Sequence, residues 1–281
     1  MKTWKKIVLG VSLISLFLGG GLVAWGYSQG GLTDLQNKTI SEQDYVKKEV
    51  KDFNKIDIKS SSYNVLIKNG DVDKATLSYY QKTKNPIDTS VKDGQLTIND
   101  NNSELDSTSN KHINFFGLKD LVRLSTLNEE VRNKTIVITL PKKQTIDFLK
   151  VDLATGNLDL SNSTIKQADI NLNVGDLTFT KMIVSNLKAN LDVGSVDSDH
   201  TLFTNSDLSI AMGDYSGDNL IFNGHNKLDV TSGDIEIALK DYTLNVQADS
   251  HSGEVDITNN LKISKDNTLT ITSDLGDITV E

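Results

Sequence analysis

The sequence contains no cysteine. This absence excludes a disulfide framework, thiolate catalysis and cysteine-ligated iron–sulfur clusters. Common catalytic strings are also missing, since there is no Gly-x-Ser-x-Gly, no phosphate-binding Gly-x-x-x-x-Gly-Lys loop and no His-Glu-x-x-His. The histidines are scattered, without the spacing that would pair them on one helix face, and stand at His112, His200, His225 and His251.

Two Ser-x-x-Lys strings occur, at 163–166 and 185–188, but they fall in strand or linker context instead of opening a helix. The sequence therefore predicts no catalytic residue, no cofactor-binding residue and no metal-binding residue. We expect a protein that is not an enzyme and that needs no cofactor.

The chain has fewer basic than acidic residues. Its 29 lysine and arginine residues and 38 acidic residues give a net charge of −9. Subtracting Lys2, Lys5 and Lys6 from this total leaves −12 for residues 7–281. An acidic chain of this kind argues against nucleic-acid binding and against charge-driven docking on anionic lipid. Much of the charge is accounted for by the solubility of a sheet-rich protein.

What the chain does contain is a repeated glycine followed by a small or acidic residue. The steps between successive pairs are 19, 19, 19, 20, 20 and 23 residues. The pairs are Gly156-Asn157, Gly175-Asp176, Gly194-Ser195, Gly213-Asp214, Gly233-Asp234, Gly253-Glu254 and Gly276-Asp277. A nearly fixed period in this range indicates a stack of equivalent structural rungs.

Apolar and polar residues alternate on both sides of these glycines, as in Leu172 and Val174 before Gly175 and Leu177 and Phe179 after it. A period of two is typical of half-buried strands, and glycine suits a corner because it reaches positive φ. The sequence predicts an all-β fold, a single-stranded β-helix or β-solenoid with rungs of about 20 residues. A β-sandwich is the alternative.

Only the glycine corner is expected to repeat strictly, because the second linker of each rung is polar and irregular in sequence. We expect a single continuous column with all seven glycine corners aligned on one edge. The side chains expected to face inward include Leu172, Val174, Leu191, Val193, Ile210, Leu228, Val230 and Ile271. Val193→Asp should then unfold the array, because an unpaired carboxylate would be buried.

An uncharged run from Ile7 to Gln29 follows the N-terminal lysines and has Trp4 and Trp25 near its edges. About 20 apolar residues can cross a bilayer as a helix, and lysines on the N-terminal side favour a cytoplasmic N-terminus. We expect a single-pass anchor in the cell membrane over 1–28, with the remainder outside the cell. A cleaved signal peptide and secretion are the alternative. There is no C-terminal sorting signal, so wall association would depend on this anchor.

Between the anchor and the repeats, residues 29–49 are polar and predict a juxtamembrane stalk. Residues 50–281 form the expected ectodomain, in which 50–149 are irregular and 150–281 carry the regular repeats. Residues 99–134 interrupt the irregular part as a loop. Within this loop, 113–124 could form a short helix that caps the column, as the terminal units of solenoids require.

The corner carboxylates would form a column if the rungs stack in register, and Asn157 and Ser195 would interrupt it. The carboxylates are those of Asp176, Asp214, Asp234, Glu254 and Asp277. Short polar side chains after glycine cap nearby backbone amides, and this is the interpretation we favour. A calcium ladder is the alternative, because calcium binds clustered oxygen ligands.

The segment Phe53-Asn54-Lys55-Ile56-Asp57-Ile58, the strand at 137–141 and the tandem Gly-Asp corners together resemble the putative adhesin family of bacterial envelope proteins. The resemblance covers about residues 50–281 and includes LiaG-like members, which are membrane proteins encoded with an envelope-stress signalling system. It implies a cell-envelope location, often in Gram-positive bacteria, and supplies no catalytic residue.

The hypothesis we favour is a non-enzymatic envelope protein whose extracellular solenoid serves adhesion or binds wall polymer or protein. An accessory role in envelope-stress sensing, with a membrane-protein partner, is an alternative. A carbohydrate-active β-helix enzyme is the third possibility, and it would need carboxylates that converge in one groove. Oligomeric state is not predicted.

Overall fold

The computed structural model describes residues 43–82, 86–100 and 134–281, in which every regular element is a β-strand. Residues from Asp44 to Glu281 form one compact unit. In these described ranges no helix is long and apolar enough to cross a membrane. The predicted anchor at 1–28, most of the predicted stalk and the predicted capping helix at 113–124 lie outside the described residues.

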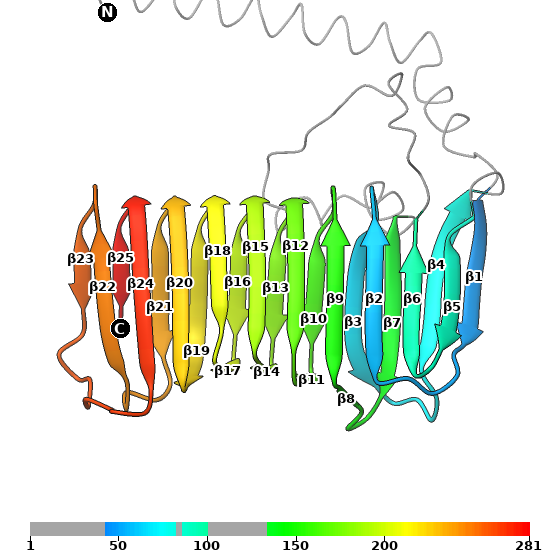
Figure 1. Ribbon diagram of the computed structural model, residues 1–281, viewed down its shortest axis with the longest axis horizontal. Helices are drawn as coiled ribbons and strands as arrows, with labels where there is room; N and C mark the ends of the chain where they lie inside the picture. Colours follow the sequence, from blue (N-terminus) through cyan, green and yellow to red (C-terminus); the bar gives the residue numbers. More distant parts are fainter. Residues whose placement is uncertain (1–42, 83–85, 101–133) are drawn as a thin grey trace, which may run out of the picture. The chain divides into compact units, whose positions relative to one another are not determined.

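Two large sheets run the length of this unit (Figure 1). The first has ten strands, in the order β22 (Asn245–Ser250), β24 (Thr268–Leu275), β20 (His225–Ser232), β18 (Asp207–Met212), β15 (Leu187–Val193), β12 (Ala168–Val174), β9 (Phe148–Leu153), β2 (Lys55–Ser60), β6 (Gln95–Asn99) and β5 (Asp88–Lys92). All its pairs are parallel except β5 with β6, so equivalent strands of successive rungs lie side by side.

The other sheet has fifteen strands and divides at β19. Its main path is β1 (Gln43–Glu49), β4 (Thr76–Lys82), β7 (Thr135–Pro141), β3 (Asn64–Gly70), β10 (Leu158–Ser161), β13 (Leu177–Thr180), β16 (Val196–Asp199) and β19 (Tyr215–Asn223). One branch continues through β21 (Ile235–Leu239) and β25 (Ile278–Val280) to β23 (Val255–Ile257). The other branch is a third face made of β17 (Leu202–Thr204), β14 (Ile183–Ser185), β11 (Thr164–Ile165) and β8 (Thr145–Ile146).

The strand register follows the period of the sequence. Leu158 pairs with Leu177, Leu177 with Val196, and Val196 with Tyr215. Because each step equals one repeat of the sequence, identical positions stack and the inward positions stay inward through the column. This parallel register is that of a β-solenoid, and it differs from the antiparallel pairing of a sandwich. β1 (Gln43–Glu49) lies inside the stretch predicted as a stalk, so these residues of the stretch belong to the sheet.

Both ends of the column depart from chain order. β2 and β3 lie between the rungs of β9–β10 and β6–β7, although β9 comes much later in the chain than β2. At the other end, β24 lies between β20 and β22, and β25 lies between β21 and β23. The glycine corners therefore stack in the order Gly233, Gly276, Gly253. The spacing of the repeats does not reveal this exchange.

The expectation that only the glycine corner repeats strictly is wrong. In five successive rungs the second corner also holds a residue with φ near 50–70°, at Lys143, Asn162, Lys181, His200 and Asn219. A third corner does the same at Asn186, Asn205 and Gly224. Asn and Gly adopt this left-handed conformation readily, but Lys and His conceal the repeat in the sequence.

The core is one continuous column of aliphatic side chains with a short aromatic stack. The rings of Phe179 and Phe203 meet edge to face with 5.3 Å between their centroids, and Phe203 stacks on Phe222 with 5.7 Å between the ring centroids. Most of the predicted inward set is buried, but Val174 is 40% exposed and Val193 is only half-buried. They immediately precede the glycine corner, where the strand has passed the end of the packed core. Val193→Asp should therefore be tolerated better than expected.

Candidate binding face of the ten-stranded sheet

The glycine corners have a structural role. The side chains of the residues that directly follow the corner glycines form a hydrogen-bond ladder along the column. The side-chain oxygen of each corner residue accepts a hydrogen bond from the backbone N–H of the equivalent residue on the next rung. Asn157 Oδ1 accepts from Asp176 N at 3.0 Å, and Asp176 Oδ1 accepts from Ser195 N at 3.0 Å. The ladder continues through Asp214, Asp234 and Asp277 to Glu254 N. These residues cap amides, as the sequence predicted.

The same ladder bears on the calcium alternative. One oxygen of each of the four corner aspartates, Asp176, Asp214, Asp234 and Asp277, already accepts from a backbone amide of the neighbouring rung. In the part of the chain that the structure describes, no group of three or more His, Asp or Glu side chains could hold a metal ion. The calcium ladder therefore gains no support from the geometry.

A broader array of polar side chains covers the outer face of the ten-stranded sheet. Its first column has alternating charge from strand to strand: Asp57, Lys150, Asp169, Lys188, Asp207 and Lys227. Its second column is richer in amides and hydroxyls: Lys59, Asp152, Asn171, Asn190, Ser209 and Asp229. We call these twelve residues the polar face.

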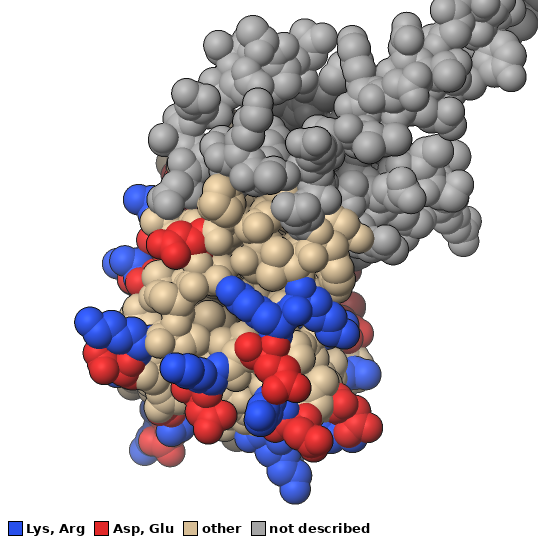
Figure 2. Space-filling view, turned by 90° about the vertical axis from the view of Figure 1, so that its right-hand side faces the viewer, with Lys and Arg blue, Asp and Glu red and all other residues tan. Residues whose placement is uncertain are grey.

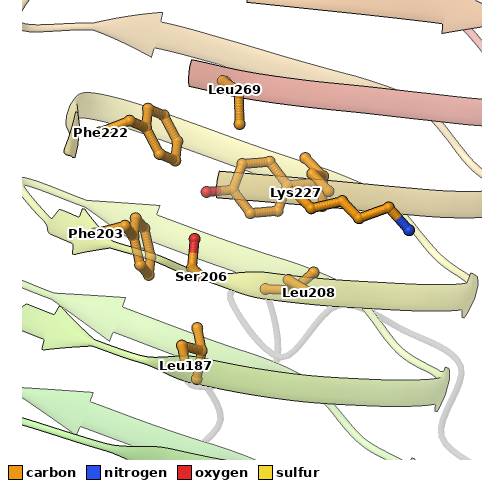
Figure 3. A pocket seen from close by; sticks show the side chains of 9 residues that line it. Leu187, Phe203, Ser206, Leu208, Phe222, Lys227 and Leu269 are labelled. Carbon is orange, nitrogen blue, oxygen red and sulfur yellow. The ribbon is translucent and has the colours of Figure 1, made fainter. Parts of the chain in front are cut away.

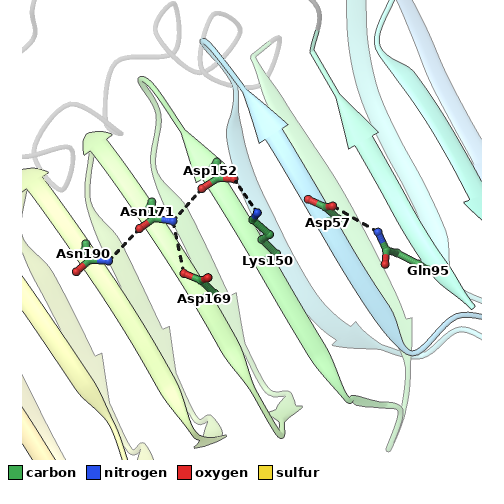
Figure 4. A network of polar contacts seen from close by, with 7 residues as sticks. All are labelled: Asp57, Gln95, Lys150, Asp152, Asp169, Asn171 and Asn190. Carbon is green, nitrogen blue, oxygen red and sulfur yellow. Dashed lines mark hydrogen bonds and ion pairs between the residues drawn. The ribbon is translucent and has the colours of Figure 1, made fainter.

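Direct hydrogen bonds tie neighbouring strands together on the polar face (Figure 4). Asn190 Nδ2 donates to Asn171 Oδ1 at 2.9 Å, and Asn171 Nδ2 donates to Asp152 Oδ1 at 2.9 Å. Lys150 Nζ lies 3.7 Å from Asp152 Oδ2. These contacts hold the side chains in fixed orientations, so a ligand would meet a surface that is already ordered.

The alternation of lysine and aspartate leaves the first column without net charge. Opposite charges on adjacent strands stabilise a sheet modestly, whereas like charges would repel. Intermingled charge also appears at the end of the column that begins with β1, where basic and acidic side chains of the described residues lie interspersed (Figure 2). The polar face is therefore suited to a ligand that is neutral or that carries charges of both signs.

An open groove of about 450 Å³ extends the polar face across β18, β20 and β24. It is lined by Asn205, Ser206, Asp207, His225, Asn226, Lys227, Thr268 and Thr270. His225 Nδ1 lies 3.1 Å from Thr268 Oγ1, and the hydrogen bond to the Asp229 carboxylate raises the pKa of Lys227. Donors and acceptors converge here with a cation, as in sites that bind hydroxyl groups.

Beneath the groove is a small apolar cavity, shown in Figure 3 with Phe203, Phe222, Leu208 and Leu269 around it. Ser206 is one of the polar groups in its wall, and its Oγ donates to Asn226 Oδ1 at 2.7 Å. The side chain of Asn226 also accepts from Ser206 N at 3.0 Å. This buried pair fixes the floor of the groove.

The structure does not bring the other chemically suggestive residues together. Ser163 is buried and donates to the Ser161 carbonyl, whereas Lys166 pairs with Asp147. His200 contacts Asp199 at a second corner, and His251 directly follows β22. His112 lies outside the described residues. Among the histidines that the structure describes, His225 alone contributes to the groove.

Among the described carboxyl groups, that of Asp159 has a raised pKa. Burial raises the pKa of Asp159; Thr178 opposes this shift through a hydrogen bond, and the charge of Asp176 adds to it. A raised pKa is found in catalytic acids, but Asp159 is not among the residues that line the groove. The burial of a strand residue beside a corner carboxylate is sufficient to account for it.

Sequence reasoning missed the polar face, although its signal was present. Lys150, Asp169, Lys188, Asp207 and Lys227 follow one another at the same intervals as the glycine corners from Gly156 onwards. Aligning the chain on its period would have placed them in one column.

Residues 53–281 match the family model described as Toastrack DUF4097. The chain belongs to this family. Membership agrees with the family resemblance of the sequence, whereas the LiaG-like relationship stays a prediction. No curated protein matches this Toastrack chain.

Several solved structures are similar at low identity. A putative adhesin from Bacteroides fragilis is 17% identical, with a TM-score of 0.38, and the match covers 85% of this chain and 97% of that chain. A putative cell adhesion protein from Clostridium sporogenes is 15% identical, with a TM-score of 0.33 and coverage of 85% and 99%. A putative lipid binding protein from Parabacteroides distasonis is 12% identical, with a TM-score of 0.38 and coverage of 86% and 98%. Similarity at this level does not indicate what this Toastrack protein binds.

Proposed function

We propose that this Toastrack protein is a non-enzymatic protein of the cell envelope whose polar face binds an extended polymer rich in hydroxyl and amide groups, such as a wall glycan. The observation that carries the proposal is the periodicity of the polar face, which presents similar hydrogen-bonding groups on successive strands. A polymer with repeated groups can meet several of these strands at once.

The order of the polar face supports this role. Side chains that are already held by hydrogen bonds, such as Asn171 and Asn190, lose little conformational freedom when a ligand binds. The many weak contacts of a repeat surface add through multivalency. Hydroxyl and amide groups match the Asn, Ser and carboxylate side chains of the second column, while lysines and aspartates of the first column accommodate either sign of charge.

The envelope location depends on the N-terminal sequence, in which Lys2, Lys5 and Lys6 precede the uncharged run 7–29. We propose that this run anchors the protein with residues 44–281 outside the membrane. Protease added to intact protoplasts should then remove the β-sheet unit and leave a small membrane-bound fragment. Mature protein that begins near Tyr27 and is free in the medium would show a cleaved signal peptide instead.

The binding role is tested by co-sedimentation of residues 44–281 with isolated, protein-free cell walls. Asn171→Ala combined with Asn190→Ala should weaken binding several-fold, because two adjacent strands lose their amides. The control is Thr178→Ala combined with Ser216→Ala, which alters outward residues of the fifteen-stranded sheet. Equal binding by the two double variants would contradict the proposal. Release of soluble sugar fragments by the wild-type protein would instead assign it to the enzymes.

A further inference from the structure

The end of the column formed by β22 and β23 has an open sheet edge. Within the described residues, β22 is hydrogen-bonded to β24 and to no other strand, and β23 is bonded only to β25. Both strands lie at the end of the column farthest from β1 (Figure 1). An edge of this kind is a template for pairing with another chain.

The hydrogen bonds of β22 show which backbone groups face the open side. Asn245 N donates to Asn267 O at 3.0 Å, and His251 N donates to Ser273 O at 2.8 Å. Since the backbone groups of successive strand residues point in opposite directions, the odd-numbered residues of β22 face β24. The N–H and C=O groups of Val246, Ala248 and Ser250 therefore face outward from the end of the sheet.

The end rung also leaves part of the core open. Val255 on β23 pairs with buried Ile278, yet Val255 is 41% exposed. Val246 and Ala248 of β22 pack against the core but are only half-buried. A terminal rung of a solenoid normally needs a cover for such side chains.

Lysine and proline, which commonly protect edge strands from pairing, are absent from β22, and its one charged residue is Asp249. The residues of β22 are Asn245, Val246, Gln247, Ala248, Asp249 and Ser250. At the opposite end of the column, the edge strand β1 carries Lys47 and Lys48, and β5 carries Lys92. Lysine on an edge strand is especially effective against association, so the two ends of the column differ in their capacity to pair.

We infer that β22 pairs with β22 of a second copy of this chain, antiparallel and about a two-fold axis at Ala248. This register uses all three outward-facing residues and forms about six backbone hydrogen bonds. It places Ala248 opposite Ala248, and Val246 opposite Ser250. The ten-stranded sheets of the two copies would then form one continuous sheet.

The side chains favour this register over its neighbours. On the outer face, Gln247 would lie opposite Asp249 of the second copy, where its amide can donate to the carboxylate. Asn245 would lie opposite His251. A two-fold axis at Asp249 would instead oppose two carboxylates, and within β22 it would pair only Ala248 with Ser250, leaving outward-facing Val246 without a partner in the strand. The axis at Ala248 is the one that pairs all three outward-facing residues of β22 with one another.

The test uses the full chain in a mild detergent and sedimentation velocity. We expect the wild-type protein to be a dimer at micromolar concentration. Gln247→Glu is nearly isosteric and places a carboxylate opposite Asp249 twice, so the Kd of the dimer should rise roughly tenfold. Gln247→Glu combined with Asp249→Asn should restore the wild-type Kd, because the opposed charges are removed.

A second variant removes a backbone donor without touching the intramolecular ladder. Ala248→Pro lacks an N–H that faces outward, and proline is tolerated on edge strands in this position. It should be monomeric, with a thermal melting curve close to that of the wild type. A monomeric wild-type chain at about 100 times the expected Kd would overturn the inference, as would a Gln247→Glu variant that dimerises as well as the wild type.

Discussion

At the glycine corners the backbones of successive rungs approach so closely that no side chain can be accommodated. A Cβ atom on Gly194 would lie 1.9 Å from the carbonyl oxygen of Gly175, and the φ of Gly194 is +148°. Both facts exclude other residues, because real Cβ atoms do not make such contacts and L-residues rarely adopt this φ. The repeated glycine is therefore a consequence of stacking.

Gly194→Ala should lower the free energy of unfolding by about 3 kcal/mol or more, because the corner must open to relieve the clash. The adjacent Ser195→Ala is the matched control. It removes only the acceptor for Asp214 N, at 3.3 Å, and should cost about 1 kcal/mol or less. Urea unfolding of both variants makes the comparison. Similar costs for the two changes would show that the corner has room for a side chain.

Tyr63 gives the protein a predictable sensitivity to alkali. Burial, followed by the charge of Asp100, raises its pKa to about 12, and its hydroxyl donates to the Tyr80 carbonyl at 3.0 Å. The folded state thus holds this proton more tightly than the unfolded state, whose tyrosine has a pKa near 10. The resulting stability is complete below pH 10 and is lost as the pH rises towards 12.

The Tyr63→Phe variant should not show the loss of stability that ionisation of Tyr63 causes as the pH rises. The difference in stability between wild type and Tyr63→Phe should therefore shrink as the pH rises from 9 to 12, as measured by denaturant midpoints in parallel series. Burial also raises the pKa of Tyr215, so both proteins will still lose some stability in this range. A difference that stays constant across the range would contradict the role assigned to Tyr63.

At the scale of the elements, local alternation was a good guide to strands and a poor guide to their order. The pattern around Gly175 predicted both β12 and β13, because each position repeats its burial in the next rung. The exchange of β24 and β22 could not be predicted in the same way. Either order buries equivalent apolar side chains, so the choice depends on the long connections at 240–244 and 258–267.

The polar face illustrates the same limit. The residues that compose it were visible in the sequence, but their alignment required the strand register. The second corner could not be seen in the sequence, because Lys181 and His200 have the same left-handed backbone conformation as Asn162 but different side chains. Val174 and Val193 were misplaced because alternation alone does not show where the packed core ends.

The exchanged strand order can be tested by disulfide crosslinking, which the absence of native cysteine makes simple. Thr270 lies beside both Lys227 and Gln247 in the ten-stranded sheet. Cysteine pairs at 227 with 270 and at 247 with 270 should form disulfides under mild oxidation, since neighbouring strands are about 4.8 Å apart. The pair at 227 with 247 should stay reduced. Rapid crosslinking of that pair alone would show that the strands stack in the order of the sequence, with β22 directly beside β20.

In the whole molecule, a stack of parallel rungs presents one ordered polar surface along its length. Such a surface differs from a single pocket in how its affinity depends on the ligand. Each further repeat of a polymer reaches another strand of the polar face, and the contacts add until the ligand is as long as the array. An enzyme of the same fold would shorten its ligand.

Calorimetric titration of residues 44–281 with wall-glycan fragments of graded length is the most direct test of this account. We expect a Kd that falls with each added repeat and then levels off, with fragments recovered intact and with weaker length dependence in the Asn171→Ala, Asn190→Ala variant. A Kd that is independent of length, or fragments that are shortened during the titration, would contradict it.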